Sequence, residues 1–301
     1  MRRTVSVITP SFNQGRFIEE TINSVISQEG DFFLEYLIMD GGSTDNTVEI
    51  IRKYEKLLAE KKYPIRCKGI EFRWVSEKDK GQTDAVNKGF KAAKGDFLGW
   101  LNSDDTYMPG AIDKAVGFFE KNNDVLMVYG QGNHIAEGGQ LMDRYPTEPF
   151  SRERLLETCF ICQPTVFLRR SVLDEVGFLD ESLHYCMDYE YWLRVSRKKK
   201  VGFLDEYLAN TRLYADTKTM SKRFEVHREI VYMLKRHHGY VPNSWLYAYT
   251  QLAVERIVRQ EGYKKLLFKA LWAAFFLLKS IQINKKLPSI PVQDIRVFLG
   301  K

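Results

Sequence analysis

Two adjacent carboxylates, Asp104 and Asp105, directly follow an apolar run at residues 97–101 that is typical of a buried strand. Ligands of open α/β sheets bind where the strands end. Two neighbouring acids on a short turn there can bind a hard divalent cation through their carboxylate oxygens, and such a cation can coordinate a diphosphate. The alternative is a solvated turn in which Asp105 or Thr106 caps the next helix and Pro109 lies in its first turn.

Three more polar loops follow apolar runs in the first part of the chain. Strands are expected at residues 4–9, 33–39, 70–76 and 97–101, and each is followed by apolar residues at helical spacing. Repeated strand, loop and helix units predict a mostly parallel sheet with right-handed crossovers. All four polar loops then meet at one edge of that sheet, and they begin near Ser11, Asp40, Asp79 and Asp104.

Each loop also has a purely structural interpretation. Ser43 or Thr44 could cap a helix whose positive end favours Asp45, whereas Asp40 ends its strand and could accept hydrogen bonds from a base or ribose. Asn87 lies on an expected helix and could simply be solvated. Other nucleotide folds are poorly supported because the chain has no G-x-x-x-x-G-K-[ST] loop and no complete dinucleotide fingerprint.

Composition sets looser limits. The 301 residues allow one large domain or two smaller ones. A net charge of +6 suits an anionic substrate or membrane surface but is too weak to argue for nucleic acid, and no nucleic-acid partner is expected. Cys159 and Cys162 form a C-x-x-C without a second pair at zinc spacing, so buried packing is expected for them. The first residues lack the long apolar region of a signal peptide, which predicts a cytoplasmic protein.

Together these motifs resemble those of family 2 glycosyltransferases with the GT-A fold. The resemblance covers residues 4–215 and rests on four motifs in family order, which are Val5–Asn13, Asp40–Asp45, Asp79–Gly89 and Asn102–Asp105. It implies an α/β fold with a Rossmann-like, mostly parallel sheet flanked by helices. It also implies inverting transfer of a sugar from a nucleoside-diphosphate sugar, with UDP as the default. The product would belong to bacterial polysaccharide or lipopolysaccharide assembly, and without a Gln-x-x-Arg-Trp motif single-sugar addition is favoured.

The resemblance also implies roles for individual residues. The nucleotide would contact the residues Pro10, Ser11, Phe12, Asn13, Asp40, Asp79, Asp84, Asn87, Asp104 and Arg212. Phe12 would stack on the base, and Asp40 with either Asp79 or Asp84 would contact base and ribose. Asp105 would be the chief ligand of Mn²⁺ or Mg²⁺, while Asp104 leans toward the ribose and completes the metal motif. Gly41 departs from the family pattern, which often has a second acid there.

The second half of the chain supplies the expected base. A helix starting near Asp188 would leave that residue in its first turn, where the family places the general base. Inverting transfer needs one carboxylate to take the acceptor proton and a cation to stabilise the diphosphate. Glu190 is the fallback base, although it would point about 200° away on the helix. Arg212 is expected to pair with phosphate, and Tyr214 stands where many members have a metal-binding histidine.

The chain changes character near residue 216, so we expect a catalytic domain at residues 1–215 and a helical region at 216–301. Helices are expected at residues 224–240, 245–260 and 263–283. The last is very apolar but too short to span a bilayer and contains a lysine. It would lie in the membrane surface, or pack on the catalytic domain or in a homodimer. The first arrangement suits a lipid-linked rather than a free saccharide acceptor and peripheral binding to the inner face of the membrane.

Two other functions were weighed against transfer. A non-catalytic sugar-nucleotide-binding or scaffold subunit could keep this fold, but the presence of Asp40, Asp104, Asp105 and Asp188 together favours an enzyme. A nucleotidyltransferase is disfavoured because the chain lacks a glycine-rich, basic N-terminal loop. Patterns do not encode the shape of the sugar and acceptor pockets.

Overall fold

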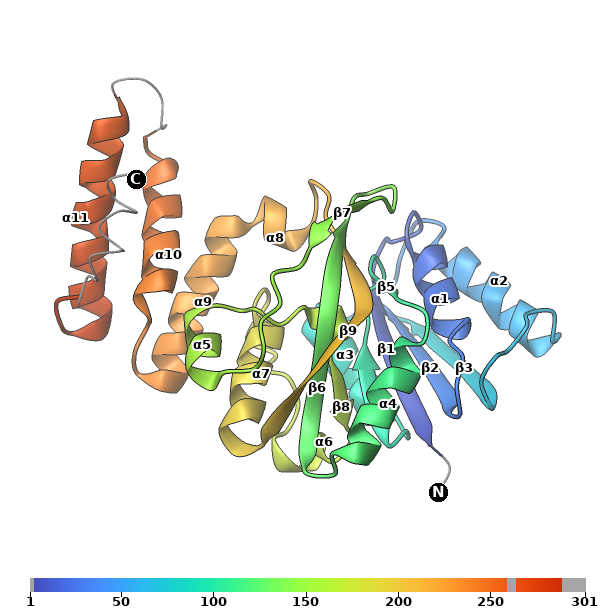
Figure 1. Ribbon diagram of the computed structural model, residues 1–301. Helices are drawn as coiled ribbons and strands as arrows, with labels where there is room; N and C mark the ends of the chain where they lie inside the picture. Colours follow the sequence, from blue (N-terminus) through green and yellow to red (C-terminus); the bar gives the residue numbers. More distant parts are fainter. Residues whose placement is uncertain (1–2, 259–263, 289–301) are drawn as a thin grey trace. The chain divides into compact units, whose positions relative to one another are not determined.

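The computed structural model describes residues 3–258 and 264–288, and the chain forms two compact units (Figure 1). The first unit comprises Met1–Arg152 and Phe160–Tyr214, and the second comprises Glu153–Cys159 and Ala215–Lys301. The helix ends predicted at residues 260 and 263 lie outside the described residues.

A mixed sheet forms the centre of the first unit. Its strands are β1 (Thr4–Ser11), β2 (Phe33–Asp40), β3 (Gly69–Ser76), β4 (Phe97–Trp100), β5 (Thr106–Tyr107), β6 (Val125–Ile135), β7 (Leu141–Arg144), β8 (Phe167–Arg169) and β9 (Lys200–Arg212). They lie in the order β3-β2-β1-β4-β8-β6-β9-β5, and β7 pairs with β6. The first four are parallel, while β8 runs antiparallel to both of its neighbours.

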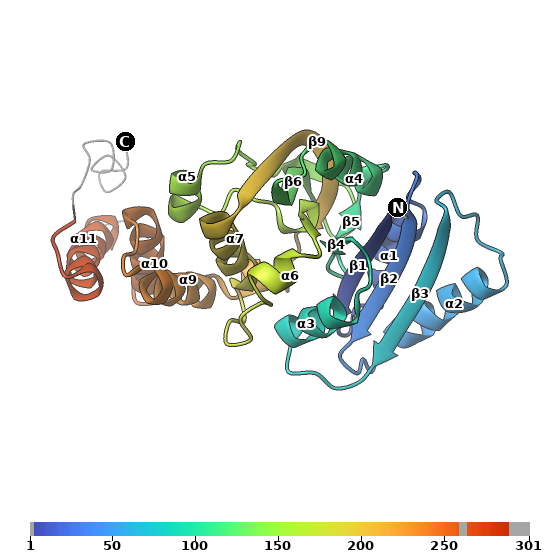
Figure 2. The ribbon, with the colours of Figure 1, turned by 90° about the horizontal axis from the view of Figure 1, so that it is seen from below.

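Helices cover both faces of the parallel part of this sheet. The helices of the first unit are α1 (Ile18–Ile26), α2 (Thr47–Ala59), α3 (Gln82–Ala92), α4 (Ala111–Lys121), α6 (Val172–Glu175) and α7 (Met187–Lys198), with a short 3₁₀ helix η1 at Gln163–Thr165. Figure 2 shows α1 and α2 on one face and α3 on the other. This follows from the strand order, because right-handed crossovers from β1 to β3 move along the sheet in one direction and the crossover from β3 to β4 returns.

The core follows the apolar periodicity of the sequence. Val5, Val7 and Ile8 of the central strand β1 are completely buried. In α1, Ile18, Ile22, Val25 and Ile26 are also completely buried, as expected for one apolar face at helical spacing. The expected sheet and its flanking helices are therefore confirmed.

Strands β6 and β9 shape the surroundings of the acidic turn. Residues 130–134 continue β6, where β9 pairs with them in parallel. The turn at Asp105 is not solvated, since this residue is 3% exposed and is followed by β5, which pairs with β9. Helix α4 begins later than predicted, with Gly110 in the left-handed conformation before it.

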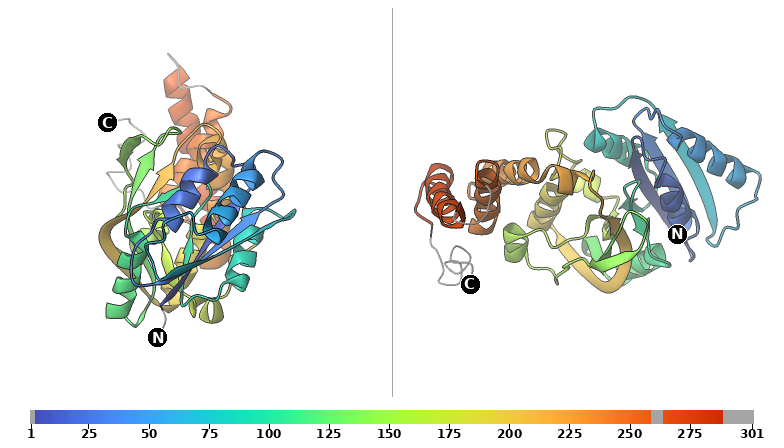
Figure 3. Two further views of the ribbon diagram at one scale, coloured as in Figure 1. Left: turned by 90° about the vertical axis from the view of Figure 1, so that its right-hand side faces the viewer. Right: turned by 90° about the horizontal axis from the view of Figure 1, so that it is seen from above.

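The second unit is helical. Its elements are α5 (Arg152–Glu157), α8 (Lys218–Ser221), α9 (Arg223–His238), α10 (Asn243–Glu255) and α11 (Lys264–Asn284). The segment of α5 is held to α10, because Trp245 Nε1 donates to the Leu156 carbonyl at 2.9 Å and Ser244 Oγ donates to the Glu157 carbonyl at 2.7 Å. Figure 3 shows α9, α10 and α11 side by side, with α10 in the middle.

Candidate functional site

The polar loops predicted from the sequence lie at one edge of the sheet. The parallel register pairs Ser11 with Asp40 and Asp40 with Ser76, and Ile8 with Trp100, so β1 to β4 end together. We call the loops that follow these strands the edge loops; they span residues 11–17, 40–46, 77–81 and 101–105. Parallel strands with loops of this kind form the usual ligand-binding edge of an α/β sheet.

The first two edge loops are joined by hydrogen bonds. The Asn13 amide N–H donates to Ser43 Oγ at 2.7 Å, and the Thr44 N–H donates to Asn13 Oδ1 at 2.9 Å. Asn13 has a φ of 51°, a left-handed conformation that asparagine tolerates better than most residues. Phe12 is 57% exposed beside this junction. A large exposed aromatic ring on a fixed loop is suited to stacking on a base.

Asp40 organises the second edge loop. It is 2% exposed, and its carboxylate accepts hydrogen bonds from the amides of Gly42 and Ser43 at 3.2 and 2.9 Å. The hydroxyl groups of Ser43 and Ser76 also donate to it, at 2.5 and 2.6 Å. Its base contact stays a prediction, because in this structure the carboxylate binds its own loop and the end of β3.

The structure gives a physical reason for Gly41. The Asp79 carboxylate accepts a hydrogen bond from the Gly81 N–H at 2.8 Å, and its other oxygen lies 2.7 Å from the place that a Cβ at Gly41 would take. Asp79 therefore occupies the space that a side chain at position 41 would need. Asp84 instead accepts from the Lys80 N–H and pairs with Lys88, so Asp79 is the better placed of the two candidates for ligand contact.

Asn87 holds the segment that precedes α7. Its amide donates to the Leu179 carbonyl and accepts from the Leu179 N–H, both at 3.0 Å, and the residue is 2% exposed. Thr83 adds a hydrogen bond to the Leu183 carbonyl at 2.9 Å. The alternative of a solvated Asn87 is therefore wrong. Its nucleotide contact stays a prediction, and its hydrogen bonds to Leu179 favour a positioning role.

Asn102 connects several parts of the site, a role that the sequence reasoning missed. Its Oδ1 accepts from Gln82 Nε2 at 2.8 Å and Trp100 Nε1 at 2.9 Å, while its Nδ2 donates to Asp105 at 3.2 Å and Gln163 at 2.9 Å. The first turn of α3, the end of β4 and η1 are therefore fixed to one side chain. Its position inside the fourth motif was the one sign in the sequence that Asn102 matters. Its partners Gln82 and Gln163 are far away in the sequence, so its connecting role could not be predicted.

The two adjacent acids occupy different environments. Asp105 is 3% exposed and accepts hydrogen bonds from the Arg212 N–H at 3.0 Å and from Asn102. Asp104 is only half-buried and accepts from the Tyr214 hydroxyl at 2.9 Å. Burial raises the pKa of both carboxyls, and the nearby charge of Asp104 helps to raise the pKa of Asp105 to about 8. The prediction made Asp105 the chief metal ligand, but this geometry favours Asp104.

Arg212 is a buried clamp, whereas the sequence predicted a phosphate contact. Its side chain is 0% exposed. The guanidinium donates to the Asp104 carbonyl at 2.8 Å, to the Glu137 carbonyl at 2.7 Å and to the Glu20 carboxylate at 2.5 Å. These partners fix the acidic turn to α1 and to the loop after β6. More exposed positive charge lies nearby in Arg16, whose guanidinium is 4.7 Å from the centre of the Tyr214 ring.

The residues present fit a divalent cation only when other ligands complete its shell. Among residues 3–258 and 264–288, no group of three His, Cys, Asp or Glu side chains could hold a metal. Mg²⁺ sites nevertheless often use one or two carboxylates together with substrate phosphates and water. The half-buried Asp104 suits that arrangement. A cation would also lower the raised pKa values of the acidic pair by opposing their charge.

Asp188 lies in the first turn of α7, as predicted. Its Oδ1 accepts a hydrogen bond from the Tyr189 N–H at 2.7 Å, and the preceding segment is tied to α3 by Thr83. Glu190, the fallback base, is 3% exposed and binds the Arg194 guanidinium through both oxygens at 2.9 and 2.8 Å. This ion pair gives Glu190 a structural role and leaves Asp188 as the candidate base.

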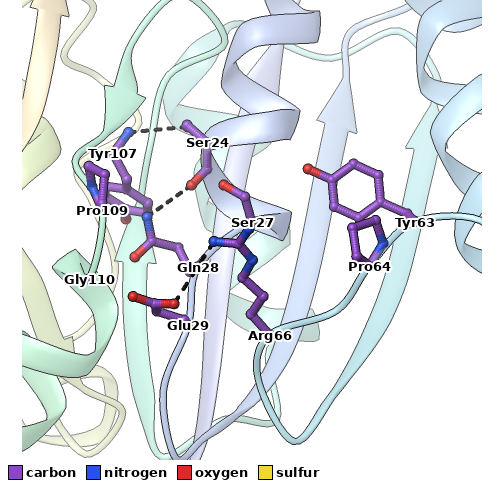
Figure 4. Close-up of a pocket in the computed structure, with 10 residues that line it drawn as sticks. All are labelled: Ser24, Ser27, Gln28, Glu29, Tyr63, Pro64, Arg66, Tyr107, Pro109 and Gly110. Carbon is purple, nitrogen blue, oxygen red and sulfur yellow. Dashed lines mark hydrogen bonds and ion pairs between the residues drawn. The ribbon is translucent and has the colours of Figure 1, made fainter.

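A separate cavity of about 220 Å³ lies at the other end of α1 (Figure 4). Ser24, Gln28, Tyr63 and Tyr107 are among its lining residues. Gln28 donates to the Ser24 and Met108 carbonyls, so its polar groups bind the protein itself. None of the predicted site residues lines this cavity, and it is distinct from the edge loops.

Comparison with known proteins adds information about the whole chain. The family model described as Glycosyl transferase family 2 matches residues 6–177. The chain is 26% identical over 226 residues to the chondroitin synthase of Escherichia coli, covering 75% of this chain and 31% of that synthase. It spans 70%, 64%, 34%, 31% and 21% of the lengths of five curated relatives that it matches.

Solved structures resemble the fold across nearly the whole chain. Staphylococcus aureus TarS 1–349 in complex with UDP-GlcNAc has a TM-score of 0.58 and 18% identity, covering 96% of this chain and 82% of that one. The mannosyltransferase PcManGT from Pyrobaculum calidifontis, in complex with GDP-Man and Mn²⁺, has a TM-score of 0.60 and 14% identity, covering 100% of this chain and 79% of that one. At these identities the similarity is one of fold.

Proposed function

Because the chain belongs to glycosyltransferase family 2, we propose that it transfers one sugar from a nucleoside-diphosphate sugar to an acceptor hydroxyl with inversion at the anomeric carbon. The observation that carries this proposal is the hydrogen-bonded set of edge loops around Asp104, with the segment before Asp188 held to α3 of the same unit. A scaffold role is not favoured, because it would require none of these arrangements.

The edge loops are suited to the nucleotide of the donor. The exposed Phe12 ring would stack on the base, and Asp79 and Asp40 would approach the base or ribose from the two neighbouring loops. UDP is our first candidate and GDP the second. The UDP-GlcNAc and GDP-Man complexes of the structural relatives support these two nucleotides as candidates.

Asp104 would hold Mn²⁺ or Mg²⁺ together with the donor diphosphate and water. The cation would supply positive charge for the departing diphosphate. Asp105 and Arg212 would act indirectly, because they are buried and fix the turn that presents Asp104. Tyr214 donates to Asp104 and thereby orients its carboxylate.

Asp188 would act as the general base on the acceptor. Its carboxylate takes the proton of the acceptor hydroxyl while that oxygen forms a bond to the anomeric carbon. The bond from this carbon to the phosphate oxygen breaks, and the nucleoside diphosphate leaves with the electron pair. Attack opposite the leaving group inverts the configuration. A saccharide or lipid-linked hydroxyl in bacterial polysaccharide or lipopolysaccharide assembly is the proposed acceptor.

Calorimetric titration with UDP-, GDP- and dTDP-sugars, each with and without Mn²⁺, tests the donor site. We expect one nucleotide to bind, with an affinity that Mn²⁺ raises at least about tenfold because the protein alone supplies few metal ligands. Mn²⁺ alone should bind weakly. No binding of any donor by the folded protein would refute the proposed function.

The matched variants Asp104→Asn and Asp105→Asn test which acid carries the cation. Asp104→Asn should abolish the Mn²⁺-dependent part of donor affinity, whereas Asp105→Asn should retain it because Asp105 is buried behind the turn. Loss of the Mn²⁺ effect only in Asp105→Asn would restore the assignment made from the sequence.

A further inference from the structure

One face of α11 packs inside the second unit. Phe268, Trp272, Phe276 and Ser280 recur every four residues and are at most 5% exposed. Trp272 Nε1 donates to Thr250 Oγ1 of α10 at 3.1 Å. This stripe attaches α11 to α10.

The opposite face of α11 is apolar and exposed. Its members share the outer side of the helix and are Leu266 (78% exposed), Leu267 (52%), Leu271 (40%), Leu277 (38%), Leu278 (65%) and Ile281 (45%). Ala270 and Ala274 lie between them and are also exposed. We call this set the outer face of α11. A contiguous exposed apolar face of this kind marks an interaction surface.

The charges around the outer face restrict what can cover it. Helix α11 contains no Asp or Glu. Its half-buried Lys269 and Lys279 fall at the helical angles of the packed stripe, and Lys279 donates to Gln282 Oε1 at 2.8 Å. Exposed Lys285 and Lys286 follow its end. A second copy would bring lysines against lysines, which is unfavourable, whereas a surface of anionic lipid headgroups would attract them.

Packing with α10 argues for a helix lying in the membrane surface rather than crossing it. The expectation that this helix is too short to span a bilayer is wrong, because Lys265–Asn284 is long and apolar enough to do so. However, its far end is fixed to the start of α10, where Asn284 exchanges two hydrogen bonds with the Val241 main chain at 2.9 and 2.8 Å. A spanning α11 would draw α10 into the hydrocarbon with its Gln251 and Glu255, which is costly.

We propose that the outer face of α11 docks on an anionic membrane surface, with its leucines in the interface and its lysines at the headgroups. The exposed Lys285 and Lys286, which follow the end of the helix, can extend their side chains to phosphate groups. This inference does not depend on the proposed transfer reaction. It does fit a lipid-linked acceptor, because it would bring the enzyme to the surface where such an acceptor lies.

Flotation with vesicles of phosphatidylglycerol or phosphatidylcholine tests the proposal on the full chain. The double variant Leu271→Glu/Leu278→Glu places charge on the outer face, and Tyr232→Glu places it at a 70% exposed position on α9. The full chain and Tyr232→Glu should float with phosphatidylglycerol vesicles and much less with phosphatidylcholine. The double variant should lose at least about tenfold in binding to the anionic vesicles. Circular dichroism melting of each variant confirms that it folds.

The outcomes separate the possible partners of the outer face. Equal vesicle binding by the double variant and by Tyr232→Glu would overturn the proposal. A dimer in light scattering that the double variant breaks, without vesicle binding by either protein, would assign the face to a second copy instead. The triple variant Lys279→Gln/Lys285→Gln/Lys286→Gln should reduce the preference for phosphatidylglycerol while leaving the leucines intact. An unchanged preference would refute the role of the lysines.

Discussion

Replacing Arg212 with methionine separates a structural clamp from a phosphate ligand. Methionine retains an unbranched side chain of similar length but removes the hydrogen bonds to the Asp104 and Glu137 carbonyls. Hydrogen bonds from a charged group contribute about 1.5–3 kcal/mol each. The ion pair with Glu20 adds little, because that carboxylate is 56% exposed and is screened by solvent. We therefore expect Arg212→Met to lower the free energy of unfolding by about 3–6 kcal/mol.

Thermal and urea unfolding measure this loss. For a unit of this size each kcal/mol corresponds to about 2–4 °C, so the melting temperature should fall by roughly 10 °C. The control is Arg16→Met, whose guanidinium is 48% exposed and should contribute at most about 1 kcal/mol. If Arg212→Met unfolds like the unsubstituted protein but loses donor affinity, the clamp account is wrong and Arg212 binds phosphate.

Three further predictions concern other parts of the chain. Glu190→Gln should lower the free energy of unfolding by about 3 kcal/mol, because it breaks the buried ion pair with Arg194. Donor turnover per folded molecule should persist in this variant, and a loss of turnover would instead make Glu190 the base. Gly41→Ala should displace the Asp79 carboxylate, which lies 2.7 Å from the position of the new methyl group. A steric conflict of this kind costs about 1–3 kcal/mol, so donor binding measured by calorimetry should weaken about tenfold. Unchanged affinity would exclude Asp79 from the site. Burial lowers the pKa of His227 from 6.5, so the unfolded chain binds more protons and stability should fall as the pH drops below 6.5. His227→Gln should make this slope shallower in urea titrations, and an identical slope would contradict the prediction.

The parallel half of the fold could be predicted because its signals are local. The apolar run of β1 and the spacing of Ile18, Ile22 and Val25 in α1 each lie within one element. The four polar loops then followed from the rule that parallel strands end at one edge. The position of Asp188 in the first turn of α7 could also be predicted, because the apolar spacing that defines this helix is local. Its apolar residues Tyr191, Trp192 and Val195 are buried in the structure.

Tertiary partners decided the features that the sequence did not reveal. Arg212 appeared to be a free cation near a phosphate site, but its carbonyl partner at Asp104 lies 108 residues earlier. Likewise, no local pattern distinguishes the buried Asp105 from the half-buried Asp104, because the difference comes from β9 and Asn102. The two-residue strand β5 is too short to produce a periodic signal.

The outer face of α11 illustrates a different limit. The sequence identified a very apolar helix but could not separate its packed side from its exposed side, since both carry large apolar residues. The contacts of Trp272 and Phe276 with α10 make that separation. Once the inner stripe is known, the exposed leucines define the surface to be tested.

Donor turnover by Asp188→Asn is the most direct test of the proposed mechanism, and it needs no knowledge of the acceptor. Water can replace the acceptor hydroxyl, so release of nucleoside diphosphate can be followed with the donor found by calorimetry. Removing a general base should reduce this turnover about 10²-fold or more, while the donor affinity stays within about twofold because the variant leaves the edge loops unchanged. Turnover that persists at the unsubstituted rate with normal donor binding would contradict the assignment of Asp188 as the base.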